Sequence, residues 1–151
     1  MCIRDSFIDA YHGEKVSVGL VYVLREYKKI LSAIQTNRCK VKEYHGLELD
    51  LIKDTFGKMG LYESTLEENT PDPMKKIDFS KVEERLGEIA KLLLELPEAE
   101  EMREFLVQLG CKASAKEIGI EESLVEKSLR LSPYVRNRLT FMRFSKVLDY
   151  E

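Results

Sequence analysis

Tryptophan is absent from this 151-residue chain, and proline, cysteine and glycine are scarce, with 4, 3 and 8 residues. So few helix-breaking residues leave long stretches uninterrupted, which favours helices. No apolar run approaches the roughly 18 residues that a membrane-spanning helix needs, so we expect no membrane contact. The net charge is −3, and basic residues alternate with acidic ones. Without a basic stripe, we expect no nucleic-acid partner.

The three cysteines, Cys2, Cys39 and Cys111, are odd in number and include no Cys-x-x-Cys pair. Neither a disulfide framework nor a zinc knuckle is expected, and a cytoplasmic location fits this composition. Residues 1–6 resemble a translated adapter or assembly scar, and we expect them to be non-native. On this hypothesis residues 7–151 form the domain, and the native reading frame begins further upstream.

Apolar residues recur at steps of three and four along much of the chain, which is typical of amphipathic helices. Hydrophobic residues make up 44% of the chain, and its length suits one domain with its own core. We therefore predict an all-α bundle of about seven helices. The pattern predicts helices over residues 13–34, 40–58, 78–96, 97–110, 121–131 and 134–148, with a short turn at 114–119. The segment 61–73 ends in two prolines, so we expect a polar, non-helical connection there.

Capping residues mark several of the predicted helix starts. Asp78 or Ser80 is expected to cap the helix that follows it, and Pro97 suits the first turn of the next helix. Ser114 and Glu117 have the spacing of a capping box.

His12 is one of two histidines, and it begins the first predicted helix with Gly13 after it. An imidazole fixed on a helix is a common ligand for a divalent metal, and the glycine lets a ligand or another backbone come close. The alternative is a helix-start histidine held by a carboxylate such as Asp9 or Glu14. A metal needs at least three protein ligands, and the residues before His12 do not supply them. The mismatch suggests a piece of an enzyme whose other part is missing.

The other candidate residues carry weaker signals. His45 repeats the His-Gly pair inside the second predicted helix, where it could meet His12 only if the helices packed antiparallel, and an ordinary helix-surface histidine is the simpler interpretation. Arg136 and Arg138 are two residues apart, so on a helix they point to different sides and cannot form one anion clamp. One of them could reach a phosphate or a partner domain, and the alternative is a structural arginine paired with an acid or a helix end.

Two further observations on the sequence identify no catalytic or binding site. The acidic run at residues 95–104 fits a solvated helix start, where negative charge is favourable. The sequence has no Ser-His-Asp set, glycine-rich phosphate loop or His-Glu-x-x-His motif. We therefore assign no catalytic residue and no cofactor-binding residue.

Three segments carry a family resemblance. Residues 12–19 read His-Gly-Glu-Lys-Val-Ser-Val-Gly, residues 109–120 read Leu-Gly-Cys-Lys-Ala-Ser-Ala-Lys-Glu-Ile-Gly-Ile, and residues 132–140 read Ser-Pro-Tyr-Val-Arg-Asn-Arg-Leu-Thr. They resemble three segments of the C-terminal helical domain of sn-glycerol-1-phosphate dehydrogenases: His-Gly-Glu-x-Val-x-x-Gly, Gly-x-x-x-(Thr/Ser)-x-Glu-Glu-(Leu/Ile)-Gly-(Leu/Ile) and Arg-(Asp/Asn)-Arg-(Tyr/Phe)-Thr. Leu139 stands where the third pattern has an aromatic residue. This family belongs to the superfamily of iron-containing alcohol dehydrogenases and 3-dehydroquinate synthases.

The resemblance implies both a fold and a chemistry. It implies that His12 ligates a divalent metal (zinc, iron or nickel), which polarises the carbonyl of dihydroxyacetone phosphate for hydride transfer from NADH or NADPH. The family's other metal ligands and its nucleotide-binding domain precede this segment. We therefore expect an N-terminally truncated, inactive fragment that exposes the first-helix face meant for the missing domain. Assembly of the intact enzyme as a homo-oligomer is compatible with the resemblance.

Two other interpretations stay open. A 3-dehydroquinate synthase-like sugar-phosphate cyclase, or another iron-containing alcohol or glycerol dehydrogenase, shares the metal histidine. A cyclase usually carries alanine where Lys15 stands and methionine where Leu20 stands. A non-catalytic helical interaction module, with no chemistry of its own, is the alternative of a different class.

Overall fold

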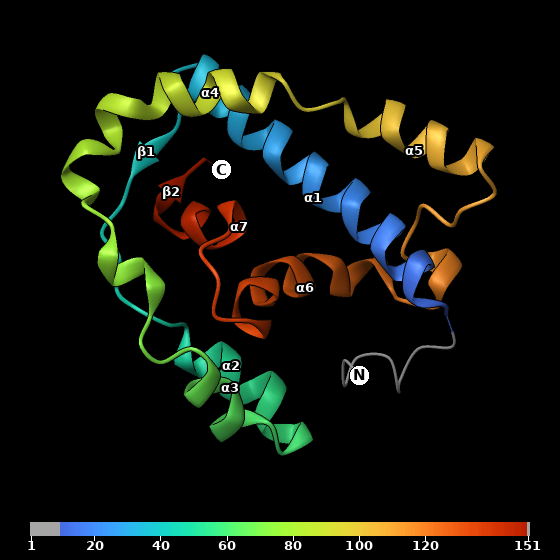
Figure 1. Ribbon diagram of the computed structural model, residues 1–151, viewed down its shortest axis with the longest axis horizontal. Coiled ribbons are helices and arrows are strands. Elements are labelled where there is room, and N and C mark those ends of the chain that lie inside the picture. The colour runs from blue at the N-terminus through green and yellow to red at the C-terminus, as the bar shows by residue number, and fades with distance from the viewer. Residues whose placement is uncertain (1–9, 151) are drawn as a thin grey trace.

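The computed structural model describes residues 10–150. Its α-helices are α1 (His12–Gln35), α2 (Leu49–Phe56), α3 (Tyr62–Glu68), α4 (Leu86–Leu94), α5 (Ala99–Gln108), α6 (Val125–Leu131) and α7 (Phe141–Phe144). The long helix α1 crosses the molecule diagonally, with α4 and α5 packed along it (Figure 1). On the other side of α1 lie α6 and α7, and α2 with α3 forms a lobe away from α1.

The expected helical class is confirmed in outline, with a different count and with short strands. Within residues 10–150, six α-helices have seven or more residues, where about seven helices were expected, and α7 is a single four-residue turn. Strands β1 (Lys40–Val41) and β2 (Leu148–Asp149) pair antiparallel, and no strand was expected. Short 3-10 turns cover Gly57–Met59, Pro73–Lys76, Phe79–Lys81, Glu83–Arg85, Lys116–Ile118, Glu122–Leu124, Ser132–Val135 and Ser145–Val147.

The apolar residues of α1 enter two hydrophobic clusters. In its C-terminal half, Ile30 is fully buried and packs with Leu93 of α4 and Leu148 of β2. In its N-terminal half, Val18 packs with Ile118. Burial of such side chains from opposite ends of the sequence is the main source of folding free energy. It fixes later segments of the chain, including β2 near its C-terminus, against the long helix α1.

The lobe of α2 and α3 attaches to the rest through a third cluster and a buried polar node. Ile52 of α2 packs on Leu131 and Tyr134. The polar node consists of Asn69, Tyr134 and Arg143. The Asn69 Nδ2 donates to the Tyr134 carbonyl oxygen at 2.7 Å, and Arg143 Nη2 donates to Asn69 Oδ1.

Arg143 is a buried cation. Its charge is stabilised by hydrogen bonds to uncharged oxygens and by the face of an aromatic ring. Its side chain is 1% exposed, and its Cζ atom lies 5.6 Å from the centre of the Tyr134 ring. Its Nη1 donates to the Arg138 carbonyl oxygen at 3.3 Å. Within residues 10–150 it makes no ion pair with a carboxylate. A buried charge held in this way depends on every partner that it has.

The predicted helix over 40–58 is wrong in its first half. Lys40 and Val41 pair with β2, residues 42–48 have no regular structure, and α2 begins at Leu49. Gly46 has a φ of +91°, which a helix does not allow. The side-chain hydroxyl of Tyr44 donates to Asp72 Oδ2 at 2.5 Å, which holds the segment in an extended path. Long-range pairing here outweighs local helix propensity.

The middle of the chain also differs from the prediction. Residues 61–73 were expected to be non-helical, but α3 occupies Tyr62–Glu68 because the prolines lie beyond its end. The helix predicted over 78–96 is shorter: Asp78 caps a 3-10 turn through the Ser80 amide at 3.2 Å, and α4 begins only at Leu86. Pro97 precedes the N-cap Glu98 and is not in the first turn of α5.

The predicted last helix over 134–148 is broken into several parts. Arg136 has extended backbone angles of φ −144° and ψ 145°, which end the 3-10 turn Ser132–Val135. Thr140 then caps α7, accepting a hydrogen bond from the Arg143 amide at 3.2 Å. The chain continues through a second 3-10 turn into β2. The apolar residues in this region have helical spacing because they are buried where the chain turns, and they do not form one continuous helix.

The predicted bounds of the first helix and the glycine that follows α5 are confirmed. The first helix covers 12–35 against the expected 13–34, and α5 is followed by Gly110 in a left-handed conformation (φ +77°). The predicted capping box does not form in full: Glu117 Oε2 accepts hydrogen bonds from the Ser114 hydroxyl at 2.6 Å and from the Ala113 amide at 3.2 Å, but the N-cap of the turn Lys116–Ile118 is Ala115, and no side chain caps that turn. Cys39 and Cys111 are free thiols, and Cys2 lies outside the described residues. Among the helices of residues 10–150, none combines the length and apolar character that crossing a bilayer requires.

Candidate functional site

His12 is the first residue of α1, and its side chain is exposed. No hydrogen bond or ion pair links its imidazole to another residue of the described range 10–150. Glu14, one of the two carboxylates proposed to hold it, is engaged elsewhere: Oε2 accepts from the Tyr11 amide at 2.9 Å, and Oε1 pairs with Lys112 Nζ at 3.1 Å. Asp9, the other, lies outside the described residues. The imidazole is therefore presented at the end of a long, well-anchored helix.

Glu14 has a structural role in this arrangement. It is the third residue of α1, where a carboxylate can accept the free amide of the N-cap and favourably meets the positive end of the helix dipole. The hydrogen bond from the Tyr11 amide, together with Lys112, lowers the pKa of Glu14 below its ordinary value. The glutamate of the His-Gly-Glu segment thus fixes the turn that carries His12.

Two of the three segments quoted for the family resemblance lie side by side. The Ser17 hydroxyl donates to the Lys112 carbonyl oxygen at 2.5 Å, and the Ala115 amide donates to the Tyr22 hydroxyl at 3.3 Å. Burial and the Glu122 carboxylate raise the pKa of Tyr22. The segment 109–120 therefore buttresses the N-terminal half of α1. The third segment, 132–140, belongs to the corner before α7.

The described residues alone do not fit a metal ion. Across residues 10–150 there is no group of three or more His, Cys, Asp or Glu side chains placed to hold one. His45 was expected inside a helix, and this prediction is wrong because it lies in the irregular segment 42–48. That segment and the start of α1 lie on opposite sides of the molecule (Figure 1), so the two histidines do not meet. His12 can supply one ligand only.

The face of α1 near His12 leaves apolar side chains and space uncovered. Tyr11, Val16 and Leu20 are 82%, 55% and 40% exposed. An added Cβ at Gly13 or Gly19 meets no described atom within 4 Å. The glycines are not required by any close approach inside residues 10–150. Residues 10–150 therefore leave this face of α1 uncovered.

Replacing Gly19 by alanine tests whether the described chain needs this glycine. Gly19 lies inside α1, where glycine costs about 0.5–1 kcal/mol relative to alanine. Because the site is open, Gly19→Ala should raise the free energy of unfolding of the 151-residue chain by about that amount. Urea denaturation followed by circular dichroism measures it. A loss of stability would show an approach that residues 10–150 do not reveal.

Arg136 and Arg138 are exposed, and the segment between Val135 and α7 is not helical. A helix was expected to direct these two side chains to different sides, and that expectation is wrong because no helix is present here. The polar groups of this segment are used for the corner: the Asn137 amide donates to Glu68 Oε1, and its Nδ2 donates to the Pro71 carbonyl oxygen, both at 3.2 Å. The motif fixes the C-terminal segment to the α3 lobe.

The acidic run at 95–104 contacts α1, where the sequence indicated only a solvated helix start. Glu98 pairs with Lys28 at 2.7 Å, and Glu100 pairs with Arg25 at 2.6 Å. Arg103, with Arg25, lowers the pKa of Glu100. Both carboxylates are exposed, at 62% for Glu98 and 59% for Glu100, so each pair contributes little to stability. They align the N-terminus of α5 along α1.

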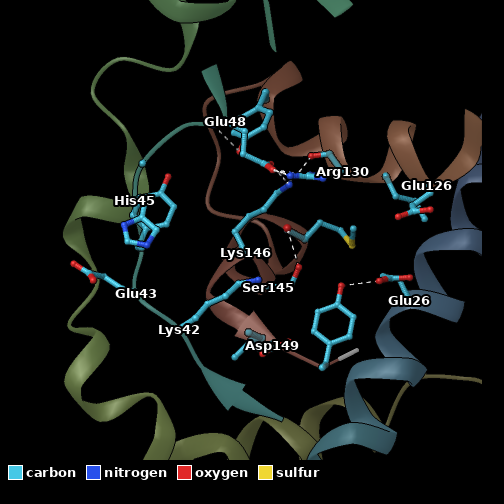
Figure 2. A pocket seen from close by; sticks show the side chains of 17 residues that line it. Glu26, Lys42, Glu43, His45, Glu48, Glu126, Arg130, Ser145, Lys146 and Asp149 are labelled. Atoms are coloured by element: carbon cyan, nitrogen blue, oxygen red, sulfur yellow. Dashed lines mark hydrogen bonds and ion pairs between the residues drawn. The ribbon is translucent and has the colours of Figure 1, made fainter. Parts of the chain in front are cut away.

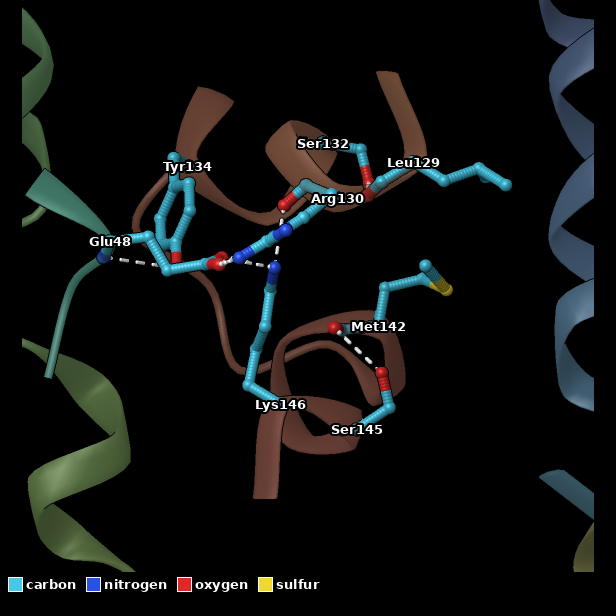
Figure 3. Close-up of polar contacts among 8 residues, drawn as sticks. All are labelled: Glu48, Leu129, Arg130, Ser132, Tyr134, Met142, Ser145 and Lys146. Atoms are coloured by element: carbon cyan, nitrogen blue, oxygen red, sulfur yellow. Dashed lines mark hydrogen bonds and ion pairs between the residues drawn. The ribbon is translucent and has the colours of Figure 1, made fainter. Parts of the chain in front are cut away.

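A cavity of about 510 Å³ lies elsewhere, between the irregular segment 42–48 and the C-terminal part of the chain (Figure 2). One wall is segment 42–48, and the other is formed by α6, the turn Ser145–Val147 and β2. At one end of it Glu48, Arg130, Tyr134 and Lys146 form a cluster that we call the Glu48 cluster (Figure 3).

In the Glu48 cluster two cations and a hydroxyl converge on one carboxylate. Arg130 Nε donates to Glu48 Oε1 at 2.5 Å, and Nη2 also contacts that oxygen. Lys146 Nζ and the Tyr134 hydroxyl donate to Oε2 at 2.5 and 3.0 Å. Lys146 also donates to the Arg130 carbonyl oxygen at 2.8 Å, and its Nζ lies 5.4 Å from the Tyr134 ring centre. The side chains of Glu48 and Lys146 are only 24% and 17% exposed.

Burial and charge act on the pKa values of the cluster in opposite senses. Burial raises the pKa of Glu48, but Arg130 and Lys146 outweigh it, so the net pKa lies below the ordinary value. Burial lowers the pKa of Lys146. Burial and the Glu48 carboxylate raise the pKa of Tyr134. Neutral pH therefore leaves Glu48 ionised and Tyr134 protonated.

Replacing Glu48 by glutamine tests the pH dependence of this cluster. The folded-state pKa of Glu48 is depressed below its ordinary value of 4.5, so its stabilising effect is present above that value and lost as the pH falls through the lower folded pKa. Glu48→Gln should lower the free energy of unfolding by about 2 kcal/mol near pH 7, and this difference should shrink toward zero in acid. Glu126→Gln, an exposed carboxylate at the same cavity, is the control. A pH-independent difference would contradict the assignment.

One curated protein is similar to this chain. It is a glycerol-1-phosphate dehydrogenase [NAD(P)+] of Geobacillus stearothermophilus, 32% identical over 84 residues. The aligned part is 55% of this chain and 21% of that enzyme. No protein-family model matches the chain, and no solved structure matches it. The likeness supports a relation to this dehydrogenase in part.

Proposed function

We propose that this chain is the helical domain of an NAD(P)-linked, metal-dependent dehydrogenase that reduces dihydroxyacetone phosphate to glycerol 1-phosphate. His12 would supply one metal ligand, and residues outside 10–150 would supply the others together with the nucleotide site. On this proposal the 151-residue chain is inactive alone. The observation that carries the proposal is the partial likeness to an enzyme named for both glycerol 1-phosphate and NAD(P).

The environment of His12 supports this assignment. The imidazole is exposed at the first residue of α1, and Glu14 anchors that turn through Tyr11 and Lys112. The neighbouring apolar side chains Val16 and Leu20 are uncovered, as expected where a second domain packs. These observations support the proposal that His12 lies where a second domain would pack.

The roles that we assign to this chain are binding and orientation. The family resemblance gives His12 as a metal ligand, but residues 10–150 offer no complete site, so no chemical step is assigned to them. Glu14, Ser17 and Lys112 hold the His12 turn against the segment 109–120. Lys15 and Leu20 differ from the residues usual in sugar-phosphate cyclases, which favours the dehydrogenase over that alternative.

An enzyme assay of the complete reading frame that contains this chain tests the proposal. The purified protein should oxidise NADH or NADPH in the presence of dihydroxyacetone phosphate, and a chelator should abolish the rate until a divalent metal is restored. The 151-residue chain should show no activity under the same conditions. Equal activity with and without chelator, or no activity with this substrate, would reject the proposal. A non-catalytic interaction module predicts no turnover in either protein.

A further inference from the structure

We propose that Arg130, Tyr134 and Lys146 form a binding site for a phosphate group, and that the Glu48 carboxylate occupies this site as an internal, displaceable ligand. In this arrangement Glu48 is an autoinhibitory contact at one end of the 510 Å³ cavity. The inference concerns a different part of the molecule from His12 and does not rest on the dehydrogenase proposal.

The donors of this site are of the kind that recognises a phosphate. A guanidinium, an ammonium and a phenolic hydroxyl all point to one position, where the two oxygens of Glu48 now lie (Figure 3). Arginine binds planar pairs of oxygens, and lysine acts as a point charge. Tyr134 is 2% exposed, so its hydroxyl is held in place by its surroundings. The position is preorganised for an oxyanion.

The charge balance favours an anion with more charge than a carboxylate. Arg130 and Lys146 carry two positive charges against the single negative charge of Glu48. The ammonium of Lys146 is mostly buried, where an uncompensated charge is costly, and Lys42 adds positive charge nearby. The exposed Glu126 carboxylate also interacts with Arg130 and offsets a small part of this excess. A phosphate carries about −1.5 to −2 charges at neutral pH and would neutralise both cations.

The segment that carries Glu48 can release it without unfolding the core. Residues 42–48 have no regular structure, and Gly46 adopts a left-handed conformation that permits a bend just before Glu48. The segment is held separately by the Lys42 amide on the Val147 carbonyl oxygen at 2.8 Å and by Tyr44 on Asp72. Rotation of the Glu48 side chain into the cavity would leave these contacts in place and expose the three donors (Figure 2).

Calorimetric titration of the 151-residue chain tests the inference. Inorganic phosphate and glycerol phosphate are titrated separately at constant ionic strength set with chloride, with no nucleotide or metal present. Glu48→Gln removes the competing charge and should bind phosphate on the order of tenfold more tightly than the unmodified chain. Glu126→Gln removes an exposed charge that acts on Arg130 only from a distance, so it should gain about twofold or less. A larger gain for glycerol phosphate than for inorganic phosphate would identify a phosphomonoester that also fills the cavity, and equal gains would identify free phosphate.

Two double variants decide whether the named cations form the site. In Glu48→Gln with Lys146→Met no ammonium is left unpaired, and in Glu48→Gln with Arg130→Gln the replaced side chain is 59% exposed, so both should fold. Both should lose the gained binding, and phosphate should raise the melting temperature of Glu48→Gln but not of either double variant. The inference is overturned if Glu48→Gln binds no better than Glu126→Gln, or if the double variants keep the gain.

Discussion

Replacing His12 by alanine in the protein encoded by the complete reading frame should lower kcat/KM for dihydroxyacetone phosphate by at least about a hundredfold. Under the proposed function the variant loses one of the few protein ligands of a catalytic metal, which would weaken metal binding and remove polarisation of the substrate carbonyl. Steady-state oxidation of NADH or NADPH measures the change. Added metal should recover part of the rate if the remaining ligands still bind it.

The chain offers a matched control in its second histidine. His45 is also exposed, but it lies on the opposite side of the molecule, in segment 42–48. His45→Ala should therefore leave kcat/KM unchanged within about twofold, a surface effect of less than 0.5 kcal/mol. Activity that survives His12→Ala, or that falls equally in both variants, would remove His12 from the metal site.

Replacing Asn69 by alanine should lower the free energy of unfolding of the chain by about 3 kcal/mol. Asn69 is 1% exposed and is an acceptor for the buried Arg143 guanidinium, while its amide satisfies the carbonyl oxygens of Tyr134 and Thr65. Without it, a buried cation that already lacks a carboxylate partner within residues 10–150 loses a hydrogen bond. Equilibrium urea denaturation, followed by circular dichroism, gives the value.

Two further variants separate this effect from a general loss of packing. Arg143→Met removes the buried charge itself and fills similar volume, so it should cost less than Asn69→Ala even though Arg143 is the larger side chain. Ser64→Ala, at an exposed hydroxyl of α3, should change stability by less than about 0.5 kcal/mol. If Arg143→Met proves the more destabilising of the two, the guanidinium is net stabilising and the account of this node is wrong.

The sequence predicts a secondary-structure element well when the interactions that form it are between residues close together in the chain. Helix α1 is predicted within a residue or two because its apolar spacing repeats over many turns. Residues 40–48 are not, because they follow the pairing of Val41 with Leu148 and the hydrogen bond of Tyr44 to Asp72. Such contacts join distant segments, and no local pattern reports them.

The candidate sites divide in the same way. His12 could be singled out because its neighbours along the chain form a recognisable motif. The Glu48 cluster could not, because its members come from three segments that meet only in the folded chain. Glu48 was assigned to a helix interior and Lys146 to a continuous last helix, and both assignments were wrong. An isolated glutamate or lysine in a charged sequence carries no signal until its partners are placed beside it.

The most direct measurement is the position of the metal in crystals of the protein from the complete reading frame, located by anomalous scattering. The account predicts a divalent metal about 2.1 Å from an imidazole nitrogen of His12, with its remaining ligands from residues outside 10–150. It also predicts that the uncovered face of α1 around Val16 and Leu20 is buried against residues outside 10–150. A metal bound elsewhere, with His12 exposed to solvent, would contradict the account.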